Sequence, residues 1–305
     1  MLGAANRASL GPQMAAVVDR QTFILPRAVA PDVEVFAVGD IHGRPDLLQA
    51  LLDEAGREPE RRPKRTLVFL GDLVDRGPDS LGAVDLARDA GRVIGADESI
   101  ALMGNHEIMM RLALDPKTPF DVALDGLGNW LRNGGGAVVR QFASFEVAPG
   151  DPEELLTVLR VALPERVRRW LESLRPSWRS QDVLFVHAGV NPYVDLDAFL
   201  NVSWNTPLAE IDEERHWAWV RWPFLEYEPG ASGYGGLFVV HGHTPNDARR
   251  DPSHARQIEG FRLNLDAGSG LTGMAKMAVI RSDEARVFTA VGPTNRMLEE
   301  QAASE

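Results

Sequence analysis

Five short polar motifs dominate this chain, and most of them directly follow an apolar, strand-like run. Their polar residues therefore fall on loops at strand ends, where an open α/β sheet gathers its chemistry. Together they supply carboxylates, imidazoles and one carboxamide, which form a ligand set for two adjacent divalent ions. The motifs occupy residues 39–43 (Gly-Asp-Ile-His-Gly), 71–77 (Gly-Asp-Leu-Val-Asp-Arg-Gly), 104–107 (Gly-Asn-His-Glu), 187–189 (His-Ala-Gly) and 241–244 (His-Gly-His-Thr).

The spacing of the apolar runs predicts an α/β fold. Runs at 33–38 and 66–70 alternate with helices that start near Pro45 and Ser80, and Gly91 is expected to end the second helix. This β-loop-α rhythm favours a parallel or mixed sheet with helices on its faces. Further strands are expected at 22–25, 100–103, 183–186, 237–240, 261–265, 277–280 and 286–289.

The rhythm breaks between about residues 115 and 180, where helical stretches replace the strands. We expect a helical insertion there. With 305 residues, the chain has the size of one large domain or of a domain with a cap. We therefore expect a flexible N-terminal segment at 1–21, a catalytic domain at 22–292 and a polar tail at 293–305.

Composition narrows the partners and the compartment. The chain has no cysteine, so any metal must be held by nitrogen and oxygen ligands, and a cytoplasmic location is expected. No apolar run approaches the roughly 20 residues of a membrane span, and the N-terminus lacks the pattern of a signal peptide. A net charge of −12 argues against a nucleic-acid or anionic-membrane surface. The oligomeric state has no sequence signal.

The motifs divide into ligands for two metal ions. Asp40 and His42 are separated by one residue, so on a strand-end loop both can turn toward one ion. Asp72 ends a neighbouring strand and is the natural bridge, because a carboxylate has an oxygen for each ion. Asn105 contributes a carbonyl oxygen. The predicted metal ligands are Asp40, His42, Asp72, Asn105, His187 and His243.

Four further residues have the chemistry for catalysis. His106 follows Asn105 and is the candidate general acid, and Asp75 can accept its hydrogen bond and orient it. Arg76 and Arg221 can hold phosphate oxygens through bidentate hydrogen bonds. Arg221 also has a packing alternative, because aromatic residues surround it. His241 ends a strand or supports the site, and it receives no ligand role.

The motifs resemble those of the phosphoprotein phosphatase family of metallophosphoesterases, over about residues 33 to 290. Bacterial members in particular resemble the stretches 130–135, 219–225 and 239–245. The resemblance implies a calcineurin-like αββα sandwich of two mixed sheets, and it carries over the same ligand and catalytic residues. It implies two divalent metal ions, Mn, Fe or Zn, with Mn common in bacterial examples. Asp266 is expected near the site without a metal role.

Three functions follow from this resemblance. The preferred one is a phosphatase that removes phosphate from phosphoserine or phosphothreonine in proteins or peptides, with phosphotyrosine as a further option, by direct attack of a metal-bridging hydroxide. The second is a symmetrical dinucleoside tetraphosphate hydrolase, which needs a groove for two nucleosides. The third is a phosphate-binding scaffold without catalysis. The intact set of His106, Asp75 and both arginines counts against a scaffold.

Overall fold

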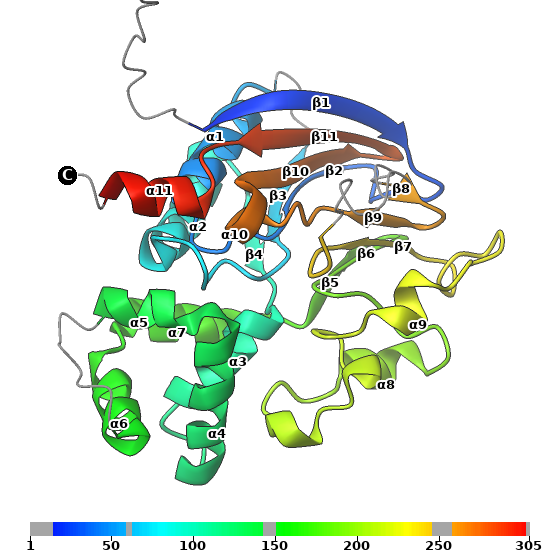
Figure 1. Cartoon of the computed structure of the whole chain (residues 1–305). Coiled ribbons are helices and arrows are strands. Elements are labelled where there is room, and N and C mark those ends of the chain that lie inside the picture. Colours follow the sequence, from blue (N-terminus) through cyan, green and yellow to red (C-terminus); the bar gives the residue numbers. More distant parts are fainter. Residues whose placement is uncertain (1–14, 59–62, 143–150, 246–257, 303–305) are drawn as a thin grey trace, which may run out of the picture.

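A computed structural model describes residues 15–58, 63–142, 151–245 and 258–302. Two mixed β-sheets lie face to face at its centre, and helices surround them (Figure 1). The predicted two-sheet α/β fold is thereby confirmed. Within the described ranges, no helix is both long and apolar enough to cross a membrane.

The first sheet has six strands in the order β1-β11-β10-β2-β3-β4. Strands β2, β3 and β4 run parallel, whereas β10, β11 and β1 extend the sheet in antiparallel fashion. The parallel part arises because α-helices connect β2 to β3 and β3 to β4. The strands are β1 (Ala16–Ile24), β2 (Val33–Val38), β3 (Lys64–Phe69), β4 (Glu98–Ala101), β10 (Met274–Arg281) and β11 (Glu284–Val291).

The second sheet has five strands in the order β5-β6-β7-β9-β8. Its centre, β6-β7-β9, is again parallel, and β5 and β8 pair antiparallel at the two edges. Each sheet thus contains three neighbouring parallel strands. The strands are β5 (Ser177–Ser180), β6 (Val183–Val186), β7 (Phe238–His241), β8 (Ile258–Glu259) and β9 (Arg262–Asn264).

Apolar side chains on both faces hold the first sheet in place. In β2, Val35 and Ala37 belong to the cluster packed against the second sheet, whereas Phe36 and Val38 belong to the cluster under the helices. This alternation follows from the two-residue period of a strand. Strands buried on both faces read as continuous apolar runs, which is why the sequence marked β2 so clearly.

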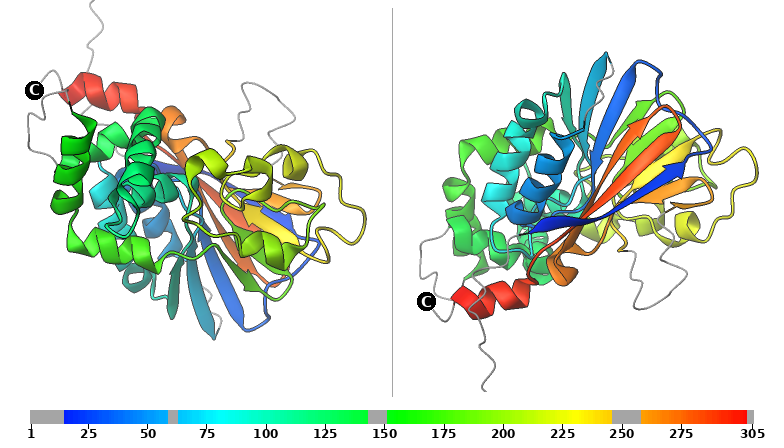
Figure 2. Two further views of the ribbon diagram at one scale, coloured as in Figure 1. Left: turned by 90° about the horizontal axis from the view of Figure 1, so that it is seen from below. Right: turned by 90° about the horizontal axis from the view of Figure 1, so that it is seen from above.

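Helices α1 (Pro45–Ala55) and α2 (Ser80–Ile94) pack against each other and cover the outer face of the first sheet (Figure 2). The helix α2 is longer than predicted. Gly91 lies inside it, and the helix ends at Gly95, which adopts the left-handed conformation at φ 66°. A C-terminal glycine ends a helix only where the chain turns left-handed, and that turn falls four residues later.

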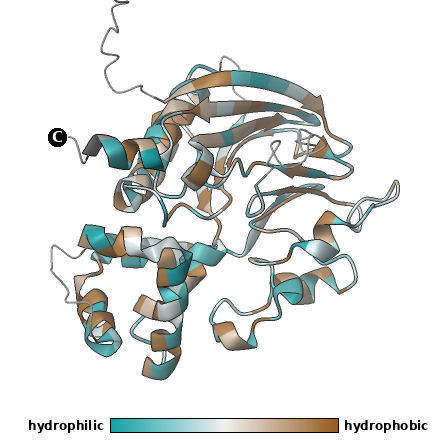
Figure 3. Cartoon of the chain, viewed as in Figure 1, coloured by the Kyte–Doolittle hydropathy of each residue, from teal (hydrophilic) through white to brown (hydrophobic). Residues whose placement is uncertain are grey.

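Helices fill the interval from β4 to β5. Figure 1 shows them gathered below the sheets, and Figure 3 shows hydrophobic and hydrophilic residues on the same helices. One amphipathic face of each can therefore pack inward. They are α3 (Asn105–Leu114), α4 (Phe120–Trp130), the kinked segment η1 (Leu131–Gly135), in which Gly134 leaves the helical conformation, α5 (Gly136–Phe142), α6 (Pro152–Ala162) and α7 (Glu165–Ser173).

Short helices make up the rest of the fold and lie in loops between strands. The first four follow β6 and border the site, and the last two flank β10 and β11. They are α8 (Leu196–Leu200), η2 (Leu208–Glu210), η3 (Glu213–Arg215), α9 (Trp222–Leu225), α10 (Ser269–Thr272) and α11 (Asn295–Ala302).

Both ends of the described chain carry secondary structure. The strand expected at 22–25 is longer: β1 begins at Ala16, within the segment expected to be flexible at 1–21, and pairs with β11; residues 1–14 lie outside the described part. Within the polar tail expected at 293–305, residues 295–302 form α11. Strand β1 has a hydrophilic middle between hydrophobic ends (Figure 3) and is mostly exposed. An edge strand of this kind lacks the alternating pattern that would reveal it.

A buried carboxylate links three neighbouring strands of the first sheet, β10, β2 and β3. Glu34 in β2 is fully buried, and its oxygens accept hydrogen bonds from Arg65 Nε at 2.6 Å and Arg281 Nε at 2.8 Å. We predict that Glu34→Ala lowers the free energy of unfolding by about 3–5 kcal/mol, because both guanidinium groups lose a buried partner. Urea denaturation measures this loss.

The control is Glu165→Ala, which removes an exposed carboxylate paired with Arg169. It should change the unfolding free energy by less than about 1 kcal/mol. Equal effects of Glu34→Ala and Glu165→Ala would contradict a structural role for the buried pair.

Candidate dinuclear metal site

The predicted ligands come together where the parallel strands of the two sheets end. Both sheets contribute, because their three-stranded parallel centres face each other. Carboxyl ends of parallel strands are where open α/β sheets place their sites. Asp40 follows β2, Asp72 follows β3, Asn105 follows β4, His187 follows β6 and His243 follows β7.

Asp72 lies at the centre of the site. Its Oδ2 is 3.5 Å from His42 Nε2, and its Oδ1 is 3.4 Å from His187 Nε2. Two clusters share this carboxylate: His42, Asp72 and His106 form one, and Asp72, His187 and His243 form the other. In each cluster the ligand atoms lie within 4.8 Å of one another. One carboxylate oxygen therefore serves each cluster, as a bridging ligand requires.

Backbone carbonyls orient two of the histidines. Nδ1 of His42 is 2.9 Å from the carbonyl oxygen of Val74, and Nδ1 of His187 is 2.9 Å from that of Leu70. Each Nδ1–H donates to its carbonyl, so the lone pair of Nε2 faces Asp72. Burial lowers the pKa of both imidazoles, which favours the neutral form that binds metals.

Asn105 and His243 complete the second cluster. The Oδ1 atom of Asn105 lies 3.1 Å from His187 Nε2 and 2.9 Å from His243 Nδ1. Nε2 of His243 is buried and has no hydrogen-bond partner. A buried nitrogen without a partner is costly in a folded protein, and a metal ion would satisfy it.

Asp40 is a member of neither cluster and lies against the backbone of His243. Its carboxylate accepts the backbone N–H of His243, at 3.1 Å from Oδ2. Burial raises the pKa of Asp40 well above its ordinary value, and the charges of Asp266 and Asp72 raise it further. Three acidic groups crowded in a buried site need a cation to remain ionised together. The residues present therefore fit divalent ions held by oxygen and nitrogen.

His106 is held by a second acidic group. Its Nδ1 lies 2.6 Å from Asp75 Oδ2, so Nε2 points to the other side. Burial alone would lower the pKa of His106, but the charge of Asp72 and the bond to Asp75 raise it above its ordinary value. Arg76 spans the two neighbouring rings, with Nη1 at 2.8 Å from His42 Nε2 and Nη2 at 2.9 Å from His106 Nε2.

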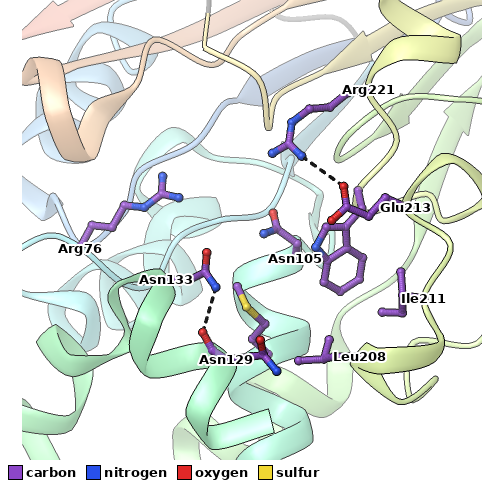
Figure 4. Close-up of a pocket in the computed structure, with 10 residues that line it drawn as sticks. Arg76, Asn105, Asn129, Asn133, Leu208, Ile211, Glu213 and Arg221 are labelled. Carbon is purple, nitrogen blue, oxygen red and sulfur yellow. Dashed lines mark hydrogen bonds and ion pairs between the residues drawn. The ribbon is translucent and has the colours of Figure 1, made fainter. Parts of the chain in front are cut away.

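A cavity of about 250 Å³ opens beside the clusters. Figure 4 shows Arg76 and Arg221 on opposite sides of it, with Asn105 between them. Met109 and Trp219 add apolar surface to its wall. The two predicted phosphate-binding arginines therefore border one space next to the metal ligands.

Glu107 belongs to the motif at 104–107, and the sequence indicates no role for it. The structure shows that it anchors two loops of the site. Its carboxylate accepts the backbone N–H groups of Asp72 at 2.8 Å, Leu73 at 2.8 Å, Val74 at 3.3 Å and Gly104 at 2.9 Å. The side chain is fully buried, and burial raises its pKa to about 7. It fixes the loops after β3 and β4, which carry two of the predicted ligands.

Trp130 is a second residue that the sequence left without a role. Its indole Nε1–H donates to Asp75, at 2.8 Å from Oδ1 and 3.0 Å from Oδ2. The sequence marked the stretch 130–135 only by resemblance. A contact across 55 positions of chain has no local signal, so the structure alone reveals it.

The structure also gives the positions of residues whose roles the sequence did not decide, His241 and the tryptophans near Arg221, and of Asp266, expected near the site. His241 is buried, its Nδ1 is 3.0 Å from the carbonyl oxygen of Gly242, and it belongs to neither cluster. Burial lowers its pKa to about 3. Asp266 is buried, and its charge raises the pKa of Asp40. Trp217 packs in the core, whereas Trp219 reaches the cavity wall.

This fold and this site define a metal-dependent hydrolase of phosphoric esters. The model of the calcineurin-like phosphoesterase family matches residues 33–268, more than half of the chain. The chain belongs to that family. The predicted family and enzyme class are thereby confirmed.

Individual relatives agree with this assignment. Serine/threonine-protein phosphatase 1 of Salmonella typhimurium is 40% identical over 230 residues, which cover 74% of this chain and 85% of that protein. A symmetrical bis(5'-nucleosyl)-tetraphosphatase of Photorhabdus laumondii is 36% identical over 108 residues, 33% of this chain and 38% of that one. Among solved structures, a cold-active protein-tyrosine phosphatase of a psychrophilic Shewanella matches with a TM-score of 0.51 and 17% identity, covering 83% of this chain and 78% of that chain. This last likeness shows the fold alone.

The position of Asp72 between both clusters leads to a test by metal content. We predict that Asp72→Asn reduces bound metal to roughly half or less of the wild-type amount, because the carboxamide lacks the charge and the second oxygen of a bridging ligand. Protein dialysed against Mn²⁺ and then against buffer is analysed for metal per chain.

Asp79→Asn is the matched control. Asp79 caps α2 by accepting the N–H of Gly82, and asparagine caps a helix equally well. Its metal content should equal that of the wild type. Two ions retained per chain in Asp72→Asn would rule out the bridge.

Proposed function

We propose that this protein is a protein phosphatase that removes phosphate from phosphoserine and phosphothreonine, and that also accepts phosphotyrosine. The observation that carries the proposal is the small cavity between Arg76 and Arg221. With about 250 Å³, it has the size for one phosphorylated side chain rather than for a large ligand. The identity to a protein named as a serine/threonine phosphatase, over most of its length, supports it.

The roles of the residues follow from their positions. Asp40, His42, Asp72, Asn105, His187 and His243 would hold two divalent ions. Bound ions would supply Lewis acidity at the phosphoryl group and a nucleophile from water at neutral pH. Arg76 and Arg221 would bind phosphate oxygens from two sides.

His106 would deliver a proton to the leaving group. Its Nδ1–H is engaged by Asp75, which leaves Nε2 as the nitrogen that would carry the proton to the ester oxygen as the phosphorus–oxygen bond breaks. Arg76 Nη2, which lies 2.9 Å from Nε2, would turn to the phosphate oxygens when substrate binds. The raised pKa of His106 supports this role, because an acid must carry its proton at the working pH.

One acidic residue at the cavity favours a monoester. Glu213 lines the cavity, and its Oε2 lies 4.0 Å from Arg221 Nη1 (Figure 4). A carboxylate there would repel additional phosphate groups next to the one held by Arg221. It suits a substrate whose flanking part is neutral or cationic, as in a peptide.

The second candidate is a symmetrical dinucleoside tetraphosphate hydrolase. A relative of this name shares 36% identity with a third of the chain, and several others are similar. Such a substrate has two nucleosides and four phosphates, so most of it would lie outside the cavity. The exposed ring of Trp222 offers one surface for a base.

The native metal is proposed to be Mn²⁺. The donor set contains only oxygen and nitrogen, because the chain has no cysteine, and such sites suit Mn²⁺. The lack of cysteine also supports our proposal of a cytoplasmic location, since nothing in the chain calls for an oxidising compartment.

A substrate panel tests the proposed function. With Mn²⁺ added, purified protein should release phosphate from phosphoserine and phosphothreonine peptides at least about tenfold faster than it splits diadenosine tetraphosphate. The reason is that the cavity admits one phosphorylated side chain; a tenfold difference in rate corresponds to about 1.4 kcal/mol in activation free energy. Metal-stripped protein is the control. Selective cleavage of the dinucleotide into two molecules of ADP would instead favour the nucleotide hydrolase. Absence of activity on every substrate would favour a phosphate-binding scaffold without catalysis.

The acid role of His106 predicts a dependence on the leaving group. His106→Ala should lower kcat by about 10²–10⁴-fold for phenyl phosphate, whose leaving group needs a proton. The loss for p-nitrophenyl phosphate should be much smaller, because that leaving group departs as an anion. Equal losses on both esters, at unchanged metal content, would exclude the role.

A further inference from the structure

The catalytic loop after β3 contains a strained turn. Asp75 and Arg76 both have positive φ, 73° and 65°, although neither is glycine. Non-glycine residues adopt this region rarely, and two in succession must be held by their surroundings. The turn sets the direction of both side chains, one toward His106 and the other toward the cavity.

Groups from three other segments hold the turn. Ser80 Oγ accepts the N–H of Asp75 at 3.0 Å, and the carbonyl oxygen of Gly134 accepts the N–H of Arg76 at 3.2 Å. Asn295 Nδ2, at the start of α11, donates to the carbonyl oxygen of Arg76 at 3.2 Å. The contact from Gly134 comes from η1, within the helical interval between β4 and β5.

The same helical interval holds the side chain of Asp75. The indole of Trp130, at the end of α4, is fully buried and donates to both oxygens of that carboxylate, at 2.8 and 3.0 Å. Oδ2 also bonds His106 Nδ1 at 2.6 Å. One N–H shared between two oxygens fixes the plane of the carboxylate, and that plane fixes the imidazole. The indole N–H can only donate a hydrogen bond, so the buried ring of Trp130 requires an acceptor, and the Asp75 carboxylate is that acceptor.

Two glycines allow η1 to approach so closely. A Cβ atom on Gly135 would lie 2.6 Å from the ring of Trp130, and one on Gly134 would lie 2.8 Å from Cγ of Arg76. Gly134 also has φ 111°, which side chains rarely allow. The chain between α4 and α5 is thus built to contact the indole on one side and the catalytic arginine on the other.

We propose that Trp130 and Gly134 are positioning residues, which orient the acid His106 through Asp75 and the phosphate-binding Arg76 through its backbone. The inference rests on the roles given to His106 and Arg76 in the proposed function. It assigns to the helical interval a part in the chemistry, beyond covering the core.

Trp130→Phe tests the first half, because it removes the indole N–H and keeps an aromatic ring. The kcat for phenyl phosphate should fall by about 10–100-fold, with KM and metal content unchanged. For p-nitrophenyl phosphate the fall should stay below about threefold, since proton delivery matters little there. Trp170→Phe is the matched control: it alters a buried tryptophan of the same core that makes no hydrogen bond to Asp75, and the ratio of the two rates should not change.

A readout independent of turnover keeps the test decisive. The short Nδ1–H bond of His106 should give a downfield proton resonance, identified by its loss in His106→Ala. In Trp130→Phe this resonance should shift or broaden, because the carboxylate is free to rotate. An unchanged resonance, or equal loss of rate on both esters, overturns the positioning role of Trp130, whether or not a protein substrate is found.

Gly134→Ala tests the second half. Titration of the Mn²⁺-loaded protein with inorganic phosphate should show affinity weaker by roughly tenfold or more, because a displaced Arg76 no longer meets the anion. Gly136→Ala is the control, since the nearest atom to its new Cβ would be 3.6 Å away. Phosphate bound equally by both variants would remove Gly134 from the proposal. If wild-type protein binds phosphate but hydrolyses no ester, the proposed function fails while this part stands.

Discussion

The geometry of the site depends on one buried carboxylate, that of Glu107. It accepts four backbone N–H groups from the loops after β3 and β4, which would otherwise be buried without partners. The loop after β3 needs such support, because Asp72 itself has a positive φ of 53°. Without these bonds, neither Asp72 nor Asn105 would have a fixed direction. Glu107, which has no predicted contact with substrate, thus fixes the loops that carry two of the predicted metal ligands.

Both sheets supply the site. Parallel strands of each sheet end at the same place, so Asp40, His42, Asp72 and Asn105 from the first sheet meet His187 and His243 from the second. The apolar cluster between the sheets holds the two sets in register. Because that core is close-packed, a shift of the second sheet would move His187 and His243 away from the predicted ligands on the first sheet. A metal site shared between sheets is therefore as rigid as the core beneath it.

The helical interval between β4 and β5 adds a second level of control. Its contacts through Trp130 and Gly134 reach the strained turn at Asp75 and Arg76 rather than the metal ligands. The α11 helix reaches the same turn through Asn295. The turn that carries the acid's partner and the phosphate-binding arginine is thus the point where three distant segments of the chain meet. Strain in such a turn persists only when its surroundings over-determine it.

The sequence by itself determined an α/β fold and the residue types at the site, because buried strands and strand-end motifs are local patterns; the resemblance of those motifs added the two-sheet arrangement and the family. It located only the end of β1, because the hydrophilic middle of that strand hides its start, and it did not determine the end of α2, which depends on which glycine turns left-handed. Only the tertiary structure placed the Asp40 carboxylate against the backbone of His243 and joined Trp130 to Asp75. Those contacts link residues far apart in the chain, and only the packing of sheets and helices brings them together.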